Sequence, residues 1–301
     1  MSNSKKSTAK IAIPVLVAGA VAALTVHASS ANTQGHDDGP SVAAEPGKPA
    51  QSGAKPFMGD PADPATWRLP IEEYLPTKSA ARLIATTRDS LIDTCMDKAG
   101  YPDWVPAPDL PEVGGTTLVD WRYGIHDAEL AAKRGYHPRA GQQEAYDAAL
   151  EAGAVDESGA DDSVLQNCTQ QADGTVPAAQ PDGLAQQISG DAFKDSAKAP
   201  AVVDVFAKWS SCMADKGYSY KKPMDANDDP AFSDPRRVSD QEIATAEADI
   251  TCRDKFSVAQ TWFDAEAALQ QKAIAANKTA LDELKDDNKE AAAKAAAVAH
   301  S

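Results

Sequence analysis

The chain has 301 residues and a formal net charge of −16, with 43% hydrophobic and 25% charged residues. This length is enough for one or two domains with a buried core. The excess of acidic residues would repel a phosphate backbone, so nucleic acid is excluded as an expected partner. Aromatic residues are few and alanine supplies much of the apolar content, which favours helices over sheets. We therefore expect an all-α protein with little or no sheet.

Residues 1–28 have the pattern of a secretory signal peptide. Three lysines precede an uncharged apolar stretch over residues 11–26, and small residues that suit cleavage follow it. The stretch is shorter than the roughly 18 residues that a membrane-spanning helix needs. We expect a secreted or extracytoplasmic protein. The alternative is that the N-terminal segment is not cleaved and holds the protein at the membrane.

Residues 29–66 contain six prolines and few large apolar side chains, which predicts a disordered tether. The folded domain is expected over residues 67–284, in two halves of about 67–175 and 198–284. No proline or glycine follows the predicted capping box Ser239-Asp-Gln-Glu242, so the C-terminal region is expected to be one long helix. Beyond Leu284 the large apolar residues nearly end, and residues 285–301 are predicted to be a fraying tail. The alternative is a helix that docks a partner.

A motif of the form Cys-Met-x-x-x-Gly-Tyr occurs twice, beginning at Cys95 and at Cys212. Each copy closes a helical pattern, the first starting near the N-cap Thr77 and the second near Ala199. Gly100 and Gly217 are predicted as the left-handed residues that end these helices, and the following tyrosine folds back on the last turn. The motif is therefore predicted to be a helix stop with a sulfur one turn inside it.

The four cysteines are expected to form two disulfides, because secretion places them in an oxidising compartment. The gaps between them are 73, 44 and 40 residues, which do not suit zinc, and we expect no metal and no cofactor. A second helical cysteine, Cys168 or Cys252, follows each copy of the motif, which indicates a degenerate duplication. Among three connectivities this arrangement favours Cys95–Cys168 with Cys212–Cys252.

Three features resemble a group of secreted proteins and lipoproteins from actinobacteria. They are the start Pro70-Ile-Glu-Glu-Tyr-Leu75, the repeated cysteine motif, and the stretch Arg122-Tyr-Gly-Ile-His-Asp127 with Gly135-Tyr-His137. The resemblance covers about residues 67–270. It implies export, and it implies no activity, since none is established for that group. The lipid-attachment cysteine of the lipoprotein members is absent here.

Candidate chemistry concentrates between residues 121 and 137. Asp127 is predicted to cap a short helix that Gly135 ends, with His126 and His137 on its two sides. These histidines could line a small polar pocket together with Arg122, Tyr123 and Tyr136, although histidines that satisfy helix ends are commoner. The surrounding aromatic residues are interpreted as core rather than as a surface for a sugar or peptide.

No catalytic fingerprint for phosphate, dinucleotide, zinc-protease or serine-esterase chemistry occurs in the sequence. We therefore expect a non-enzymatic binding or accessory protein of the cell envelope or extracellular space. Its expected partner is an envelope or extracellular protein or peptide. The alternative is an extracytoplasmic, hydrolase-like enzyme that uses Arg122, Tyr123 and His126.

Overall fold

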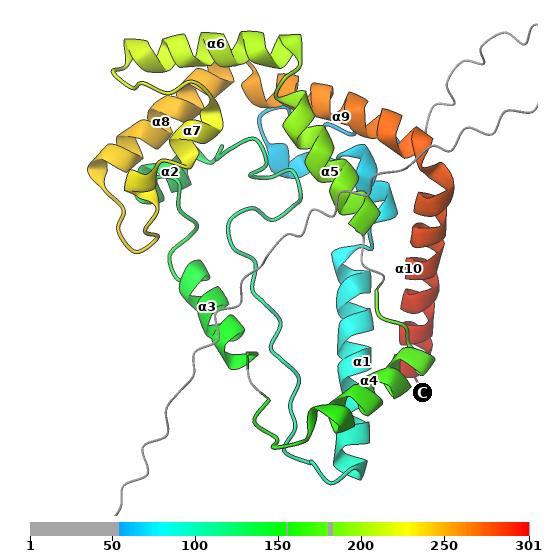
Figure 1. Cartoon of the computed structure of the whole chain (residues 1–301). Coiled ribbons are helices and arrows are strands. Elements are labelled where there is room, and N and C mark those ends of the chain that lie inside the picture. Colours follow the sequence, from blue (N-terminus) through cyan, green and yellow to red (C-terminus); the bar gives the residue numbers. More distant parts are fainter. Residues whose placement is uncertain (1–53, 155, 180–182, 301) are drawn as a thin grey trace, which may run out of the picture. The chain divides into compact units, whose positions relative to one another are not determined.

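The computed structural model describes residues 54–154, 156–179 and 183–300. Within these residues the protein is all-α, as predicted, with ten α-helices, three short 3-10 helices and no strand (Figure 1). The α-helices are α1 (Lys78–Lys98), α2 (Ala128–Arg134), α3 (Gln142–Ala152), α4 (Asp162–Thr175), α5 (Gly183–Ser196), α6 (Pro200–Asp215), α7 (Pro223–Asn227), α8 (Asp240–Lys255), α9 (Val258–Ala276) and α10 (Lys278–Ala299). The 3-10 helices are η1 (Pro64–Thr66), η2 (Pro70–Tyr74) and η3 (Pro230–Phe232). The predicted signal peptide and residues 29–53 of the predicted tether lie outside the described residues.

The main core forms around α9, which packs against α5, α6, α8 and η2 (Figure 1). Aromatic rings fill this core: the ring centroid of Trp262 lies 4.8 Å from that of Phe193 and 5.0 Å from that of Phe206. Trp67 and Trp209 are fully buried in the same cluster. The few aromatic residues of the chain are thus largely used to fill one interior.

A second group of helices consists of α1, α4 and α10. Helix α1 packs against both α4 and α10, and Figure 1 shows α1 and α10 side by side. Ile84 of α1 is buried with Val176, Ala291 and Ala295. The two alanines are one turn apart on α10, and their small side chains let the two helices approach closely.

Both copies of the cysteine motif end a helix in the predicted way. Gly100 has φ +96° and Gly217 has φ +94°. The Tyr101 N–H donates to the Met96 carbonyl at 2.9 Å, and the Tyr218 N–H donates to the Met213 carbonyl at 2.9 Å. These are the hydrogen bonds of a Schellman motif, so the glycines are required by their left-handed backbone.

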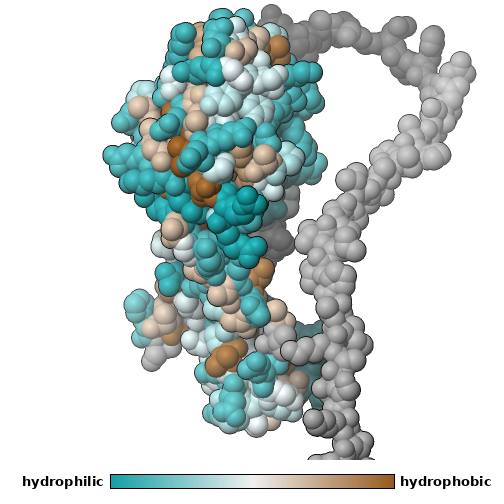
Figure 2. All heavy atoms as spheres, turned by 90° about the vertical axis from the view of Figure 1, so that its left-hand side faces the viewer, coloured by the Kyte–Doolittle hydropathy of each residue, from teal (hydrophilic) through white to brown (hydrophobic). Residues whose placement is uncertain are grey.

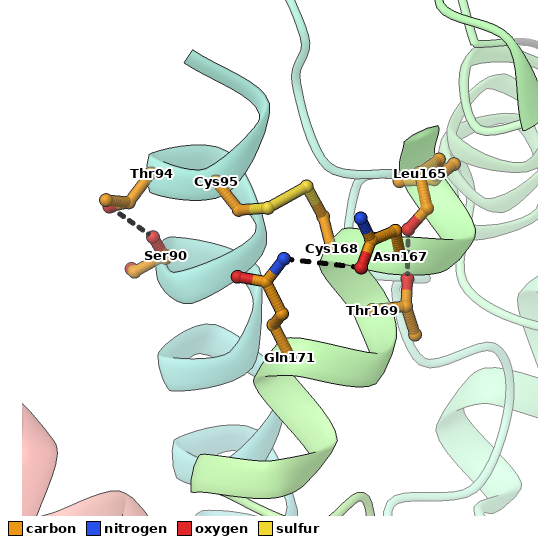
Figure 3. Close-up of a disulfide and its surroundings, with 8 residues drawn as sticks. All are labelled: Ser90, Thr94, Cys95, Leu165, Asn167, Cys168, Thr169 and Gln171. Carbon is orange, nitrogen blue, oxygen red and sulfur yellow. Dashed lines mark hydrogen bonds between the residues drawn. A yellow bond between two sulfur atoms is a disulfide. The ribbon is translucent and has the colours of Figure 1, made fainter. Parts of the chain in front are cut away.

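The disulfide pairing is confirmed as Cys95–Cys168 and Cys212–Cys252. The first joins α1 to α4, and Figure 3 shows its sulfur atoms bridging the two helices. The second joins α6 to α8 inside the main core. Whether the two halves derive from a duplication stays a prediction.

Residues 54–66 pack on the domain, so the predicted boundary at residue 67 is corrected. Ala54 is buried in the main core, and Phe57 exchanges backbone hydrogen bonds with Arg68. The Trp67 indole N–H donates to the Asp60 carbonyl at 2.7 Å. The segment turns at residues 60–62 and forms η1, and the side chains of Gln260 and Gln271 on α9 donate to the carbonyls of Pro61 and Ala54.

The C-terminal region is three helices, α8, α9 and α10, and not the predicted single helix. The chain breaks at Ser257, which has φ +49°, and again at Asn277. Ser239 does cap α8, but the Glu242 side chain turns to the Tyr136 N–H instead of completing the capping box. Residues 285–299 are packed on α1, so the predicted fraying tail is also wrong.

One face of the protein, seen in Figure 2, is predominantly hydrophilic. On the face shown in Figure 2, hydrophobic residues occupy small, separate spots. In the part of the chain that the structure describes, no helix combines the length and apolarity required to cross a bilayer.

Candidate functional site

The five predicted pocket residues do not converge. Arg122 and Tyr123 contact Glu266, Tyr136 and His137 contact Glu242 on α8, and His126 contacts Asp120. Asp127 caps α2 and Gly135 ends it, as predicted. The short helix therefore separates the two histidines into different surroundings, and only His126 lies beside an open cleft.

Arg122 and Tyr123 act together on the buried carboxylate of Glu266 in α9. The Arg122 guanidinium donates from Nε and Nη2 at 2.6 to 3.0 Å, and the Tyr123 hydroxyl donates at 2.8 Å. Burial, together with the adjacent Glu266 charge, raises the pKa of Tyr123, so the phenol stays a neutral donor. Gln270 donates to the same carboxylate at 2.8 Å. Glu266 is fully satisfied, and this group is structural.

Tyr136 bridges two buried acids of α8. Its backbone N–H donates to Glu242 at 3.0 Å, and its hydroxyl donates to Asp249 at 3.2 Å. His137 Nε2 lies 3.4 Å from Glu242 Oε1, and neither that nitrogen nor Glu242 Oε2 has a hydrogen-bond partner among the described residues. His137 and Glu242 are enclosed by the protein, so a substrate has no access to them. Their contact connects α2 to α8.

Arg253 holds the segment that carries His126. Its guanidinium binds both carboxylate oxygens of Asp249 at 2.7 and 2.8 Å, and donates to the carbonyls of Tyr123 and Ile125 at 2.7 and 2.6 Å. Burial raises the pKa of Asp249, and the charge of Arg253 opposes that rise. The α8 residue thereby fixes residues 123–125 against the helix.

At the solvent-facing edge of the site, His126 makes a close contact with the carboxylate of Asp120. Its Nε2 lies 2.6 Å from Asp120 Oδ1, while its Nδ1 lies 3.9 Å from Asp63 Oδ1. Burial alone would raise the pKa of Asp120, but hydrogen bonds from His126 and Thr116 outweigh it and hold that pKa below its usual value. The imidazole is thus oriented by a carboxylate.

A cleft of about 320 Å³ opens next to His126, and we call it the α8–α9 cleft. Its wall combines apolar and polar residues. The lining residues are Pro61, Ala62, Pro64, Trp67, Gly124, Ile125, His126, Ile250, Arg253, Asp254, Ser257, Val258, Ala259 and Gln260. Three segments that are far apart in the sequence therefore form one hollow.

The start of α9 at this cleft is strained and lacks a cap. Ser257 is the one non-glycine residue with positive φ in the described part of the chain, and its side chain makes no capping hydrogen bond. At the N-terminal end of α9, the first backbone N–H that makes a helical hydrogen bond is that of Thr261, which donates to the Ser257 carbonyl. The N–H groups of Val258, Ala259 and Gln260 are left as donors, as at any helix start without a cap. Strain of this kind concentrates at functional sites.

Charged side chains surround the cleft, and most of them have a partner of opposite charge or a hydrogen-bond partner. Arg253 is paired with Asp249 and His126 with Asp120, and burial raises the pKa of Asp254 at the rim. Among the described residues, no group of three or more His, Cys, Asp or Glu side chains is arranged to hold a metal ion.

The sequence did not indicate Ser257, Asp254 or Arg253 as site residues. Arg253 directly follows Cys252, and that proximity to a cysteine predicted to form a disulfide was the available signal. The aromatic residues of the region are core, as interpreted, since Trp104, Tyr123 and Tyr136 are buried.

Comparisons with known proteins add no relative. No family model matches the chain, and neither a curated protein nor a solved structure matches it.

Proposed function

We propose that this is a non-enzymatic binding protein of the cell envelope or extracellular space that binds a peptide segment in the α8–α9 cleft. The two disulfides support an oxidising compartment, and the apolar stretch at the N-terminus supports export. Its resemblance to exported actinobacterial proteins supports the same location.

The observation that carries the proposal is the uncapped first turn of α9 beside apolar residues of the cleft wall. A peptide carbonyl can accept from the N–H groups of Ala259 and Gln260, while an apolar side chain packs on Pro61 and Ala62, which are exposed in the cleft. The cleft volume of about 320 Å³ is at the small end for ligand sites. It therefore accommodates one residue of a chain rather than a large cofactor.

The test is a selection of random displayed peptides on the mature protein, followed by calorimetry with the selected peptides. Ala62 lies in the cleft and is exposed, so Ala62→Trp fills the cleft without disturbing the core. We expect this variant to bind at least about tenfold more weakly. The matched control Ala148→Trp, on the exposed side of α3, should bind as the unmodified protein does. Equal binding by both variants, or no selected peptide, would overturn the proposal.

A hydrolase-like enzyme is the second candidate, because His126, oriented by Asp120, and the strained Ser257 line the same cleft. Arg122 and Tyr123 are fully engaged with Glu266, which removes them from that alternative. A fluorophosphonate probe discriminates the two. Labelling of Ser257 that is lost in His126→Ala would favour the enzyme, and an unlabelled protein that binds peptide would favour the binding protein.

A further inference from the structure

An exposed proline-rich segment, residues 105–112, runs back beside α1, and we call it the strap. In Figure 1 it belongs to the coil that leaves the C-terminal end of α1. All eight residues are exposed. Trp104 is buried just before the strap, and at its other end Lys78 of α1 binds the Glu112 carboxylate and the Thr116 carbonyl. Both ends are therefore anchored while the middle faces solvent.

The strap sequence favours a polyproline II conformation. Proline fixes φ near −65°, and the residue before a proline is confined to extended conformations. Six of the eight residues are proline or precede proline, which leaves Asp109 and Glu112 unconstrained in this way. No backbone hydrogen bond ties residues 105–113 to another described residue, as expected of this helix.

Three residues per turn sort the strap into faces. Val105, Pro108 and Pro111 share one face, and the Val105 side chain is 74% exposed, more than any other large hydrophobic residue that the structure describes. Asp109 and Glu112 share the next face, where Arg82 and Lys78 of α1 hold them. The apolar face is thus presented in a fixed orientation, so little ordering would accompany its binding.

We propose that the strap docks into an aromatic-lined groove of a partner protein that recognises polyproline II segments and carries cationic side chains beside that groove. Proline rings and free carbonyls every third residue are the features that such grooves bind. Asp103, Asp109 and Glu112 give the strap an acidic border, which two cations of α1 only partly offset. The strap shares no residue with the α8–α9 cleft, so this surface and the peptide site stand or fall separately.

The experiment places the photo-crosslinker p-benzoylphenylalanine at Val105 of the full chain, expressed in its own cells. The matched control places it at Val203, which is also an exposed apolar residue, on α6. Irradiation should link the Val105 position, and not the Val203 position, to one protein that mass spectrometry identifies. Its purified groove domain is then titrated with the full chain.

We expect the double variant Pro108→Ala/Pro111→Ala to bind that domain at least about tenfold more weakly, because the alanines release the extended conformation. Asp109→Lys keeps every proline and should also weaken binding, most strongly at low salt. An unchanged melting temperature shows that either variant is folded, since the strap adds no buried side chain. No linked protein, equal linking from Val203, or binding that both variants leave unchanged would overturn the proposal.

Discussion

Asp249 and Arg253 lie one turn apart on α8 and form an ion pair with both side chains almost fully buried. The pair receives further hydrogen bonds from Trp209 and Tyr136, and it holds two carbonyls of the chain before α2. This cluster connects α6, α8 and the segment that carries His126. It therefore couples the stability of the main core to the shape of the α8–α9 cleft.

Replacing Arg253 by Met should destabilise the protein strongly. The change leaves the Asp249 carboxylate buried without its cation, and breaking a buried pair in this way costs about 3–5 kcal/mol. Urea unfolding followed by circular dichroism measures it. The control Arg236→Ala removes an exposed ion pair and should change the free energy of unfolding by less than about 1 kcal/mol. Equal midpoints for both variants would contradict the argument.

Gly124 is required by the same cluster. It has φ +103°, and a Cβ atom at this position would overlap the Arg253 guanidinium. Gly124→Ala should therefore destabilise the protein and weaken peptide binding in the cleft. Gly190 lies inside α5 with ordinary φ and open space around it, so Gly190→Ala should stabilise the protein by about 0.5–1 kcal/mol. Thermal unfolding of the two variants should give shifts of opposite sign.

Local signals made much of the fold predictable. The caps Thr77, Asp127 and Ser239, and the glycine stops after the two cysteine motifs, depend on residues within one helical turn. The break at Ser257 was not predictable, because no glycine or proline marks it. The packing of Ala291 and Ala295 was missed because small residues bury little area themselves and act by letting α1 approach.

The candidate site was predictable only in its neighbourhood. His126 was identified from its place in the sequence, but the cleft beside it combines the residues around Pro61, Ile125 and Ser257. Their proximity follows from tertiary contacts that no local pattern encodes, since Gln260 donates to the Pro61 carbonyl and Arg253 to the Ile125 carbonyl. Arg122 and Tyr123 were grouped with His126 because they are neighbours in sequence. In the structure Arg122 and Tyr123 both bind Glu266, whereas His126 contacts Asp120.

The two disulfides should differ in how much they contribute to the free energy of unfolding. In the chain-entropy model, loops of 73 and 40 residues give each of them roughly 4 kcal/mol, slightly more for Cys95–Cys168. Both cysteines of Cys212–Cys252 are buried in the main core, however, whereas Cys95 of the other disulfide is only half-buried, so removing Cys212–Cys252 leaves more unfilled space. We expect the double variant Cys212→Ala/Cys252→Ala to unfold at a lower urea concentration than the double variant Cys95→Ala/Cys168→Ala. The reverse order would show that loop length dominates.

Acid should weaken the protein partly through Asp120. Its pKa is lowered in the folded protein, so its contribution is present above the unfolded pKa of about 4 and is lost as the pH falls through the folded pKa. Unfolding free energies of the protein and of Asp120→Asn should differ at pH 6. The difference should shrink steadily below pH 4. A difference that is independent of pH would show that the Asp120 carboxylate is not stabilised by His126 and Thr116.

The C-terminal end of α10 should be required for stability because it packs on α1. Ala295 is fully buried, whereas Ala293 on the same helix is exposed. Ala295→Arg places a charge against Ile84 and Val176 and should cost more than about 2 kcal/mol of unfolding free energy. Ala293→Arg is the matched control, with the same helix propensity change and an expected effect within about 0.5 kcal/mol. Urea unfolding measures the free energy of unfolding of both variants. Equal effects at the two positions would support the original prediction that residues 285–301 form a tail without packing contacts.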